Sequence, residues 1–184
     1  MIILVAIFIV GIFILLMPKI LRSFGLHPEY SGKSHSLPGK KALIIATNQA
    51  ELNKPGKTGG KATGAFLSEI TVAYYDFLDA SMHVDVASIK GGKIPIEPQS
   101  LSYFIKTTAD KRFLKDVELR KKIENSRAIA DVDFTAYDII FLAGGWGAAY
   151  DLGFSETLGT KISQAYYADK IIGAVCHGPL GLLK

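Results

Sequence analysis

The sequence has little cysteine and little net charge. One cysteine stands among the 184 residues, so an internal disulfide framework and a multi-cysteine metal cluster are both excluded. The 21 basic and 17 acidic residues are scattered along the chain and leave a formal net charge of +4. A charge this small argues against a nucleic-acid partner. The single thiol, Cys176, is typical of a protein in a reducing compartment and is free for chemistry.

Charged side chains are missing altogether at the N-terminus. Residues 1–17 contain none and are almost entirely Ile, Leu, Val, Phe and Ala. The run predicts a transmembrane helix over residues 1–22, long enough for a hydrocarbon core of about 30 Å because Lys19 can snorkel to the surface. A cleaved signal peptide is the alternative, but no basic residue precedes the run and no small-x-small site follows it. Since Lys19 and Arg22 flank its C-terminal end, we expect a single-pass membrane protein whose domain faces the cytoplasm.

Residues 23–40 are rich in Gly, Ser, Pro and His and show no periodicity, which predicts a linker. A domain over residues 41–184 follows, in which short apolar runs predict strands and apolar residues at helical spacing predict helices. Strands that alternate with helices indicate an α/β fold whose mostly parallel sheet is covered on both faces. The predicted strands are residues 41–47, 82–88, 137–142 and 170–175, and the predicted helices lie around residues 66–78, 115–125 and 158–166.

The chain stops at Lys184, eight residues after Cys176, where a helix should follow the last predicted strand. A parallel-sheet domain normally completes that helix before it ends. We therefore expect the domain to be incomplete at its C-terminus.

The strongest local motif is Cys176-His177-Gly178-Pro179, which follows the predicted strand 170–175 directly. A strand that runs into a nucleophile and then into a helix predicts a nucleophile elbow. Backbone N–H groups and the helix dipole at such a turn would lower the pKa of the Cys176 thiol, and His177 would act as its base or cationic partner. The alternative is a buried structural cysteine that has a histidine beside it by chance.

A second motif, Gly144-Gly145-Trp146-Gly147, follows the strand 137–142. In a parallel sheet its glycines would lie near Cys176 and let backbone N–H groups approach a substrate oxygen, as an oxyanion hole requires. The structural alternative is a tight turn into the next helix, with Asp151 near the N-terminus of that helix.

Glu69 is a third candidate, because it stands on an otherwise apolar helix. A carboxyl group that faces the end of the sheet could stay protonated through desolvation and donate a hydrogen bond to a thiolate. A solvent-facing glutamate is the alternative, and spacing alone favours it.

These motifs, together with residues 84–92 (VDVASIKGG) and 95–100 (PIEPQS), resemble the ThiJ/PfpI superfamily, particularly its glyoxalase III and heat-shock chaperone branch. The resemblance covers residues 41–183 and implies a flavodoxin-like three-layer sandwich that is usually dimeric. By motif, it implies that Cys176 is the nucleophile, that His177 is its partner and that Glu69 is the acid that hydrogen-bonds the cysteine. It also implies that Gly144 and Gly145 form the oxyanion turn, and we count Trp146 with them as a substrate-binding residue.

Two departures from the family pattern bear on function. The branch usually carries histidine at the position of Trp146, so this chain lacks a polar group and a potential metal ligand there. The carboxylate that completes the triad in this branch normally lies downstream of the Cys-His pair, beyond Lys184. We therefore expect a Cys176–His177 dyad in the chain as given, with no metal ion.

The resemblance implies a cofactor-independent enzyme that converts small reactive aldehydes such as methylglyoxal to hydroxy acids. A deglycase, peptidase or amidase would use the same nucleophile with water as the second substrate. Two further classes stay open, namely a holding chaperone or redox sensor in which Cys176 is oxidised beside Glu69, and a catalytically inactive, membrane-tethered interaction domain. We expect an aldehyde or a modified protein as substrate, the membrane and a second copy of the chain as partners, and no nucleic acid.

Overall fold

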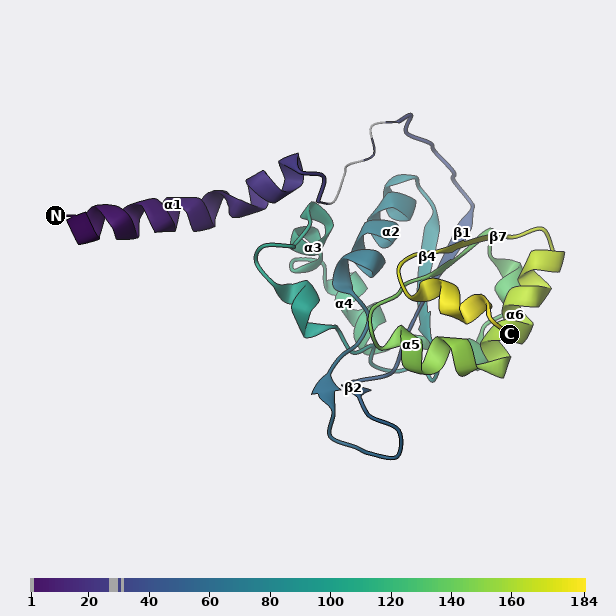
Figure 1. Cartoon of the computed structure of the whole chain (residues 1–184). Coiled ribbons are helices and arrows are strands. Elements are labelled where there is room, and N and C mark those ends of the chain that lie inside the picture. Colours follow the sequence, from purple (N-terminus) through teal and green to yellow (C-terminus); the bar gives the residue numbers. More distant parts are fainter. Residues whose placement is uncertain (1, 27–29, 31) are drawn as a thin grey trace.

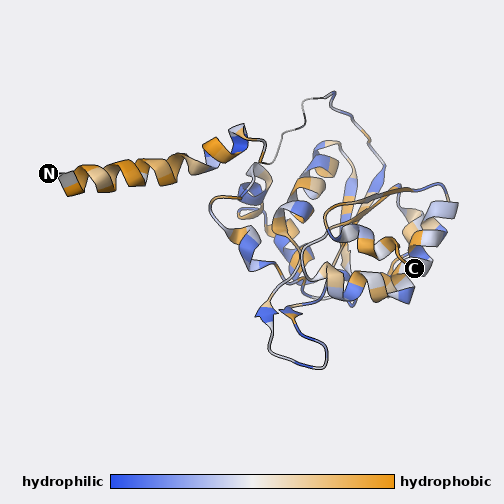
Figure 2. Ribbon diagram, in the orientation of Figure 1, coloured by the Kyte–Doolittle hydropathy of each residue, from blue (hydrophilic) through white to orange (hydrophobic). Residues whose placement is uncertain are grey.

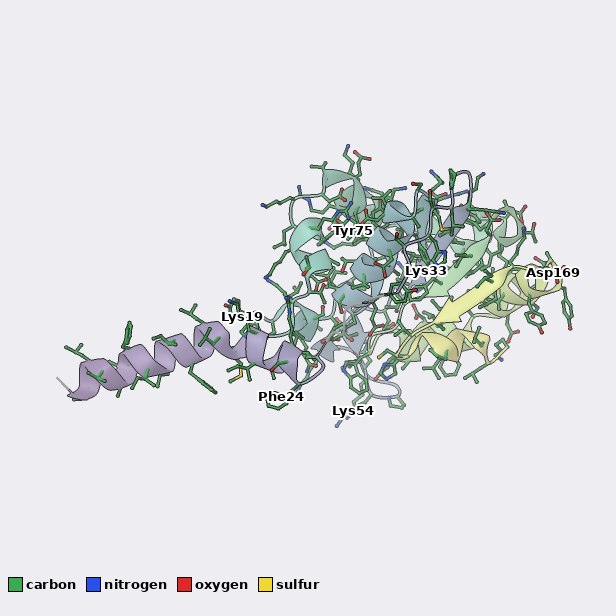
Figure 3. All side chains as sticks on the ribbon, turned by 90° about the horizontal axis from the view of Figure 1, so that it is seen from above. Lys19, Phe24, Lys33, Lys54, Tyr75 and Asp169 are labelled. Atoms are coloured by element: carbon green, nitrogen blue, oxygen red, sulfur yellow. The ribbon has the colours of Figure 1, made fainter. Side chains whose placement is uncertain are left out.

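The structure is a computed structural model that describes residues 2–26, 30 and 32–184, so parts of the expected linker lie outside it (Figure 1). Helix α1 (Ile2–Ser23) projects from the domain and is apolar along its length (Figure 2). Figure 3 shows Lys19 near the domain end of α1 and Asp169 on the opposite side of the molecule. Among the described residues, α1 is the one helix long and apolar enough to cross a membrane, and a signal sequence would meet the same criteria. The membrane anchor therefore stays a prediction.

The central sheet has five parallel strands in the order β5-β4-β1-β6-β7, which confirms the predicted parallel sheet. Residues 42–46 at its centre are fully buried, because helices cover both faces. Four strands coincide with the predicted apolar runs, namely β1 (Lys41–Ala46), β4 (His83–Ser88), β6 (Ile139–Leu142) and β7 (Ile171–Ala174). The fifth is β5 (Arg127–Ala128).

Helices pack in one layer on each face of the sheet (Figure 1). Side chains of β1 alternate between two clusters, with Ile44 facing α2 (Leu67–Asp79) and α4 (Val117–Glu124), and Leu43 facing α6 (Glu156–Tyr167). The predicted three-layer arrangement is thus present. The remaining helices are α3 (Thr108–Phe113), α5 (Ala148–Asp151), and the 3-10 turns η1 (Pro98–Leu101), η2 (Ile129–Asp131), η3 (Phe134–Ala136), η4 (Leu152–Phe154) and η5 (Gly178–Leu182).

Several short elements differ from the prediction. A hairpin of β2 (Glu51–Leu52) and β3 (Lys61–Ala62) extends from the carboxyl end of β1, and β5 adds a strand to the sheet. Two-residue strands are too short to show a period. The helix predicted around residues 115–125 is α4, and α3 precedes it as a further helix that starts at a capping box between Thr107 and Asp110.

The order of the strands fixes where a site can form. The chain passes from β1 through α2 to β4 on one side, and later strands β6 and β7 are added on the other side of β1. Loops that leave β1 and β6 therefore diverge at their carboxyl ends, the place where open α/β sheets bind ligands. The turns that carry the two predicted motifs lie at this edge.

Candidate active site

Cys176 lies on a sharp turn two residues after the end of β7. Its backbone has φ of +56°, a left-handed conformation that costs a residue with a side chain roughly 1–3 kcal/mol. Gly178 permits the turn, because a Cβ there would overlap the backbone of Leu142 at the end of β6. The strand-to-helix elbow expected from the sequence is present, and it presents an exposed thiol.

His177 reaches back to the thiol of the preceding residue. Its Nδ1 lies 3.2 Å from Sγ of Cys176, and the tautomer decides which atom donates. Because Nδ1 is already within hydrogen-bond distance of the sulfur, the ring can take the thiol proton without any rearrangement of the backbone. The two halves of the predicted dyad are therefore in contact.

Glu69 comes from the first turn of α2 and points into the site, so the solvent-facing alternative does not hold. Its Oε2 accepts a hydrogen bond from the backbone N–H of Gly144 at 2.6 Å. Burial raises the pKa of the Glu69 carboxyl, and hydrogen bonds from Gly144 and Cys176 oppose that rise. Desolvation therefore acts in the direction that the sequence argument expects, toward the protonated form.

The pKa of the Cys176 thiol is raised, so the expectation of a lowered pKa is wrong. Burial is the largest cause and the charge of Glu69 the next, while backbone N–H groups of Gly145 and His177 act in the opposite direction. The helix after the cysteine is η5, a short 3-10 turn whose dipole is small. Protonation of Glu69 would remove the second cause and leave the N–H groups to stabilise a thiolate.

The glycine turn after β6 lies against both other parts of the site. A Cβ on Gly144 would lie 2.6 Å from the backbone nitrogen of His177 and 2.8 Å from Oε2 of Glu69. Gly145 has φ of +98°, which a side chain rarely adopts. Since the N–H of Gly144 already donates to Glu69, the backbone donors that face the sulfur belong to Gly145 and His177. Sequence reasoning missed the N–H of His177, although the residue after an elbow nucleophile commonly supplies one.

Trp146 projects from the same turn toward His177. The two ring centroids are 4.7 Å apart with an interplanar angle of 45°, and half of the surface of Trp146 is exposed. Within the part of the chain that the structure describes, no group of three His, Cys, Asp or Glu residues is placed to hold a metal ion.

Asp151 holds a loop beside the site. It lies in the first turn of α5, as expected, and because that helix has four residues it is also the last residue of α5. Its Oδ2 accepts a hydrogen bond from the N–H of Asn48, and its Oδ1 is buried without a partner among the described residues. Burial raises the pKa of this carboxyl. The loop that it holds packs on Gly147, where a Cβ would lie 2.8 Å from the carbonyl oxygen of Gln49.

The profile of the DJ-1/PfpI family matches residues 62–184, a range that includes Glu69, the glycine turn and Cys176. This chain belongs to the DJ-1/PfpI family. The resemblance to the ThiJ/PfpI superfamily is thereby confirmed.

Several known proteins are similar to this chain. The chain is 28% identical over 144 residues to the glutathione-independent glyoxalase hsp3101 of Schizosaccharomyces pombe, which is 77% of this chain and 57% of that protein. It is similar to the structure of the 24 kDa Rapid Encystment Protein of Francisella tularensis, with 33% identity, a TM-score of 0.71, and coverage of 79% of this chain and 63% of the other. Glyoxalase III from Candida albicans gives 26% identity and a TM-score of 0.67, with coverage of 77% and 59%. The chain thus spans about three fifths of the length of these relatives.

Proposed function

We propose that this protein is a cysteine-dependent enzyme that converts small α-oxoaldehydes such as methylglyoxal to hydroxy acids without glutathione. The observation that carries the proposal is the contact of His177 Nδ1 with the Cys176 sulfur at 3.2 Å, on an elbow that also faces Glu69. The names of two relatives, a glutathione-independent glyoxalase and a glyoxalase III, support the same chemistry.

The first step is addition of the sulfur to the aldehyde. His177 takes the thiol proton, and the thiolate of Cys176 forms a C–S bond with the aldehyde carbon while the C=O electron pair moves to oxygen. The resulting oxyanion would meet the backbone N–H groups of Gly145 and His177, which already face the sulfur. Return of the proton from His177 to this oxygen gives a hemithioacetal.

The second step moves a proton between adjacent carbons. A base removes the hydrogen from the former aldehyde carbon, and the neighbouring carbonyl carbon receives a proton. The hydroxyl proton of the first carbon passes to the neighbouring oxygen, so a thioester and a hydroxyl form, and the first carbon is oxidised and the second reduced within one molecule. Glu69 and His177 are the two groups that could carry it, and burial raises the pKa of Glu69, which makes its protonated form easier to reach. Water then hydrolyses the thioester and releases the hydroxy acid and the thiol. The cycle consumes one water and needs no external oxidant or cofactor.

Membrane attachment and dimerisation belong to the same proposal. Helix α1 would anchor the chain, with Lys19 and Arg22 on the cytoplasmic side. A second copy would associate as a homodimer. Light scattering of the purified chain in detergent tests the dimer, and a monomeric mass after subtraction of the micelle would contradict it.

The test of the reaction uses the full chain in detergent micelles with methylglyoxal and without glutathione. Lactate is measured beside Cys176→Ser, which replaces the thiol with a much weaker nucleophile of similar size. We expect lactate from the wild-type chain and none from the variant, with equal thermal melting. A folded wild-type protein that yields no lactate would overturn the proposal. In that case, release of amines from glycated peptides would indicate a hydrolase, and suppression of aggregation without either activity would indicate a chaperone.

A further inference from the structure

The ring of His177 lies against the indole of Trp146, and this pairing has the geometry of a stabilising aromatic contact. Centroids 4.7 Å apart and a 45° tilt fall within the range in which aromatic rings attract one another beyond simple burial. The imidazole is half-buried and has one hydrogen-bond contact among the described residues, the one with the Cys176 sulfur. The second ring nitrogen has none there, so hydrogen bonds alone do not fix the rotation of the ring.

The indole of Trp146 is well placed to restrict the rotation of the His177 ring, because the glycines on both sides of Trp146 pack closely against other loops. A Cβ on Gly145 would lie 2.5 Å from the nitrogen of Phe66, and a Cβ on Gly147 would lie 2.8 Å from the carbonyl oxygen of Gln49. The carbonyl of Trp146 itself accepts a hydrogen bond from the N–H of Ala149. A turn packed this closely against two loops presents its side chain in a defined direction.

We propose that Trp146 is the positioning residue for His177, and that its indole holds the imidazole with Nδ1 on the Cys176 sulfur. A base beside a nucleophile works best when a third group orients it, and a carboxylate often fills that role. In the described part of this chain, the aromatic group packed against the His177 ring is the indole of Trp146. The inference rests on the proposed role of His177 as proton acceptor and not on the identity of the substrate.

The reactivity of the thiol reports this role without any substrate. The ionisable side chains at the Cys176 sulfur are Glu69 from α2 and His177 from the elbow, and residues 144–147 of the facing turn contribute none. When the imidazole is held at the sulfur, Nδ1 can accept the thiol proton and the thiolate forms readily. When the ring is free to rotate, that acceptor is lost, and the thiol reacts more slowly and needs a higher pH.

The experiment measures alkylation of the full chain by iodoacetamide from pH 5 to 10. Trp146→Ala should slow alkylation at pH 7 by about three- to tenfold, the fold-change that corresponds to the loss of one aromatic pair. It should also move the pH profile of alkylation to higher pH. Trp146→Phe retains a ring and should restore most of the rate. Tyr150→Ala is the matched control, since Tyr150 is a partly exposed aromatic residue of the neighbouring helix α5. Profiles of Trp146→Ala and wild type that coincide would overturn the proposal.

The chain has a single tryptophan, so fluorescence gives a second readout that does not depend on a variant of Trp146 that folds. An imidazole in contact with an indole quenches its emission, so the emission should be stronger in His177→Asn than in the wild type. Equal emission from the two proteins would refute the contact in solution. A wild type that makes no lactate but passes both tests would remove the proposed reaction alone, whereas lactate formation with both tests negative would remove only this inference.

Discussion

The carboxyl of Glu69 receives a 2.6 Å hydrogen bond from the backbone N–H of Gly144 and also contacts the thiol of Cys176. One side chain of α2 thus links the turn after β6 with the turn after β7. Burial raises the pKa of both the carboxyl and the thiol, and a negative charge on Glu69 raises the pKa of the thiol further. The predictions for Glu69 follow from this electrostatic coupling.

Replacement of the acid should separate thiol reactivity from turnover. In Glu69→Gln the charge that raises the pKa of Cys176 is gone, so that pKa falls and alkylation at pH 7 becomes faster. Lactate formation should fall by about 100-fold, because the amide cannot transfer the proton. Glu118→Gln on α4 is the control, since that side chain is largely exposed. Slower alkylation in Glu69→Gln would contradict the coupling.

Asp151 should make the fold less stable as pH rises. Its pKa is raised in the folded state, so its contribution is fully present below the unfolded value of about 3.9 and is lost as pH rises through the folded value. Asp151→Asn keeps an oxygen for the N–H of Asn48 and should abolish this part of the pH dependence. Asp151→Ala leaves that N–H without its acceptor and should cost about 1–3 kcal/mol. Urea unfolding at pH 4, 5.5 and 7 measures both effects. If the free energy of unfolding changes equally with pH in the wild type and in Asp151→Asn, the raised pKa of Asp151 is not the cause of the pH dependence.

A methyl group on Gly144 should disable the site more than it weakens the fold. The added Cβ would meet the nitrogen of His177 and the carboxyl of Glu69, so the two turns must separate at a cost of about 1–3 kcal/mol. A shift of this size at reacting groups should lower lactate formation by about 100-fold. Gly56→Ala is the comparison, because Gly56 has φ of +72° and open space around it, and it should lose stability without losing activity. Equal turnover in both variants would show that the Gly144 contact is dispensable.

Helix α1 should stay with the chain in cell membranes. An anchor predicts that the intact N-terminus resists carbonate extraction, whereas a cleaved signal predicts a shorter protein that is released. Mass spectrometry of the N-terminus distinguishes the two. A processed, released chain would refute the anchor.

The sequence was sufficient where a period or a motif was long. Apolar runs located β1, β4, β6 and β7, and helical spacing located α2 and α6, because each buries a full face. It failed where the outcome depends on contacts between distant segments. The two-residue β5 has no period. The carboxyl of Glu69 comes to face the sulfur only when α2 packs beside the turn after β6. That packing also reversed the expected direction of the Cys176 pKa, since the helix after the cysteine is short and an acid stands opposite it.

The polarity of the parallel sheet sets where reactants enter. The linker packs at the amino end of the strands, where the N–H of Leu37 donates to the carbonyl of Ala80 shortly before β1 begins at Lys41. The two turns that carry chemistry leave the carboxyl ends of β6 and β7, about 20 Å away at 3.3 Å per residue over the length of β1. If α1 lies in a bilayer, the chain leads from the membrane to the amino end of the strands, and the reactive turns stand at the other end of the sheet. Soluble aldehydes would then arrive by free diffusion, and compounds dissolved in the hydrocarbon would have to leave it first.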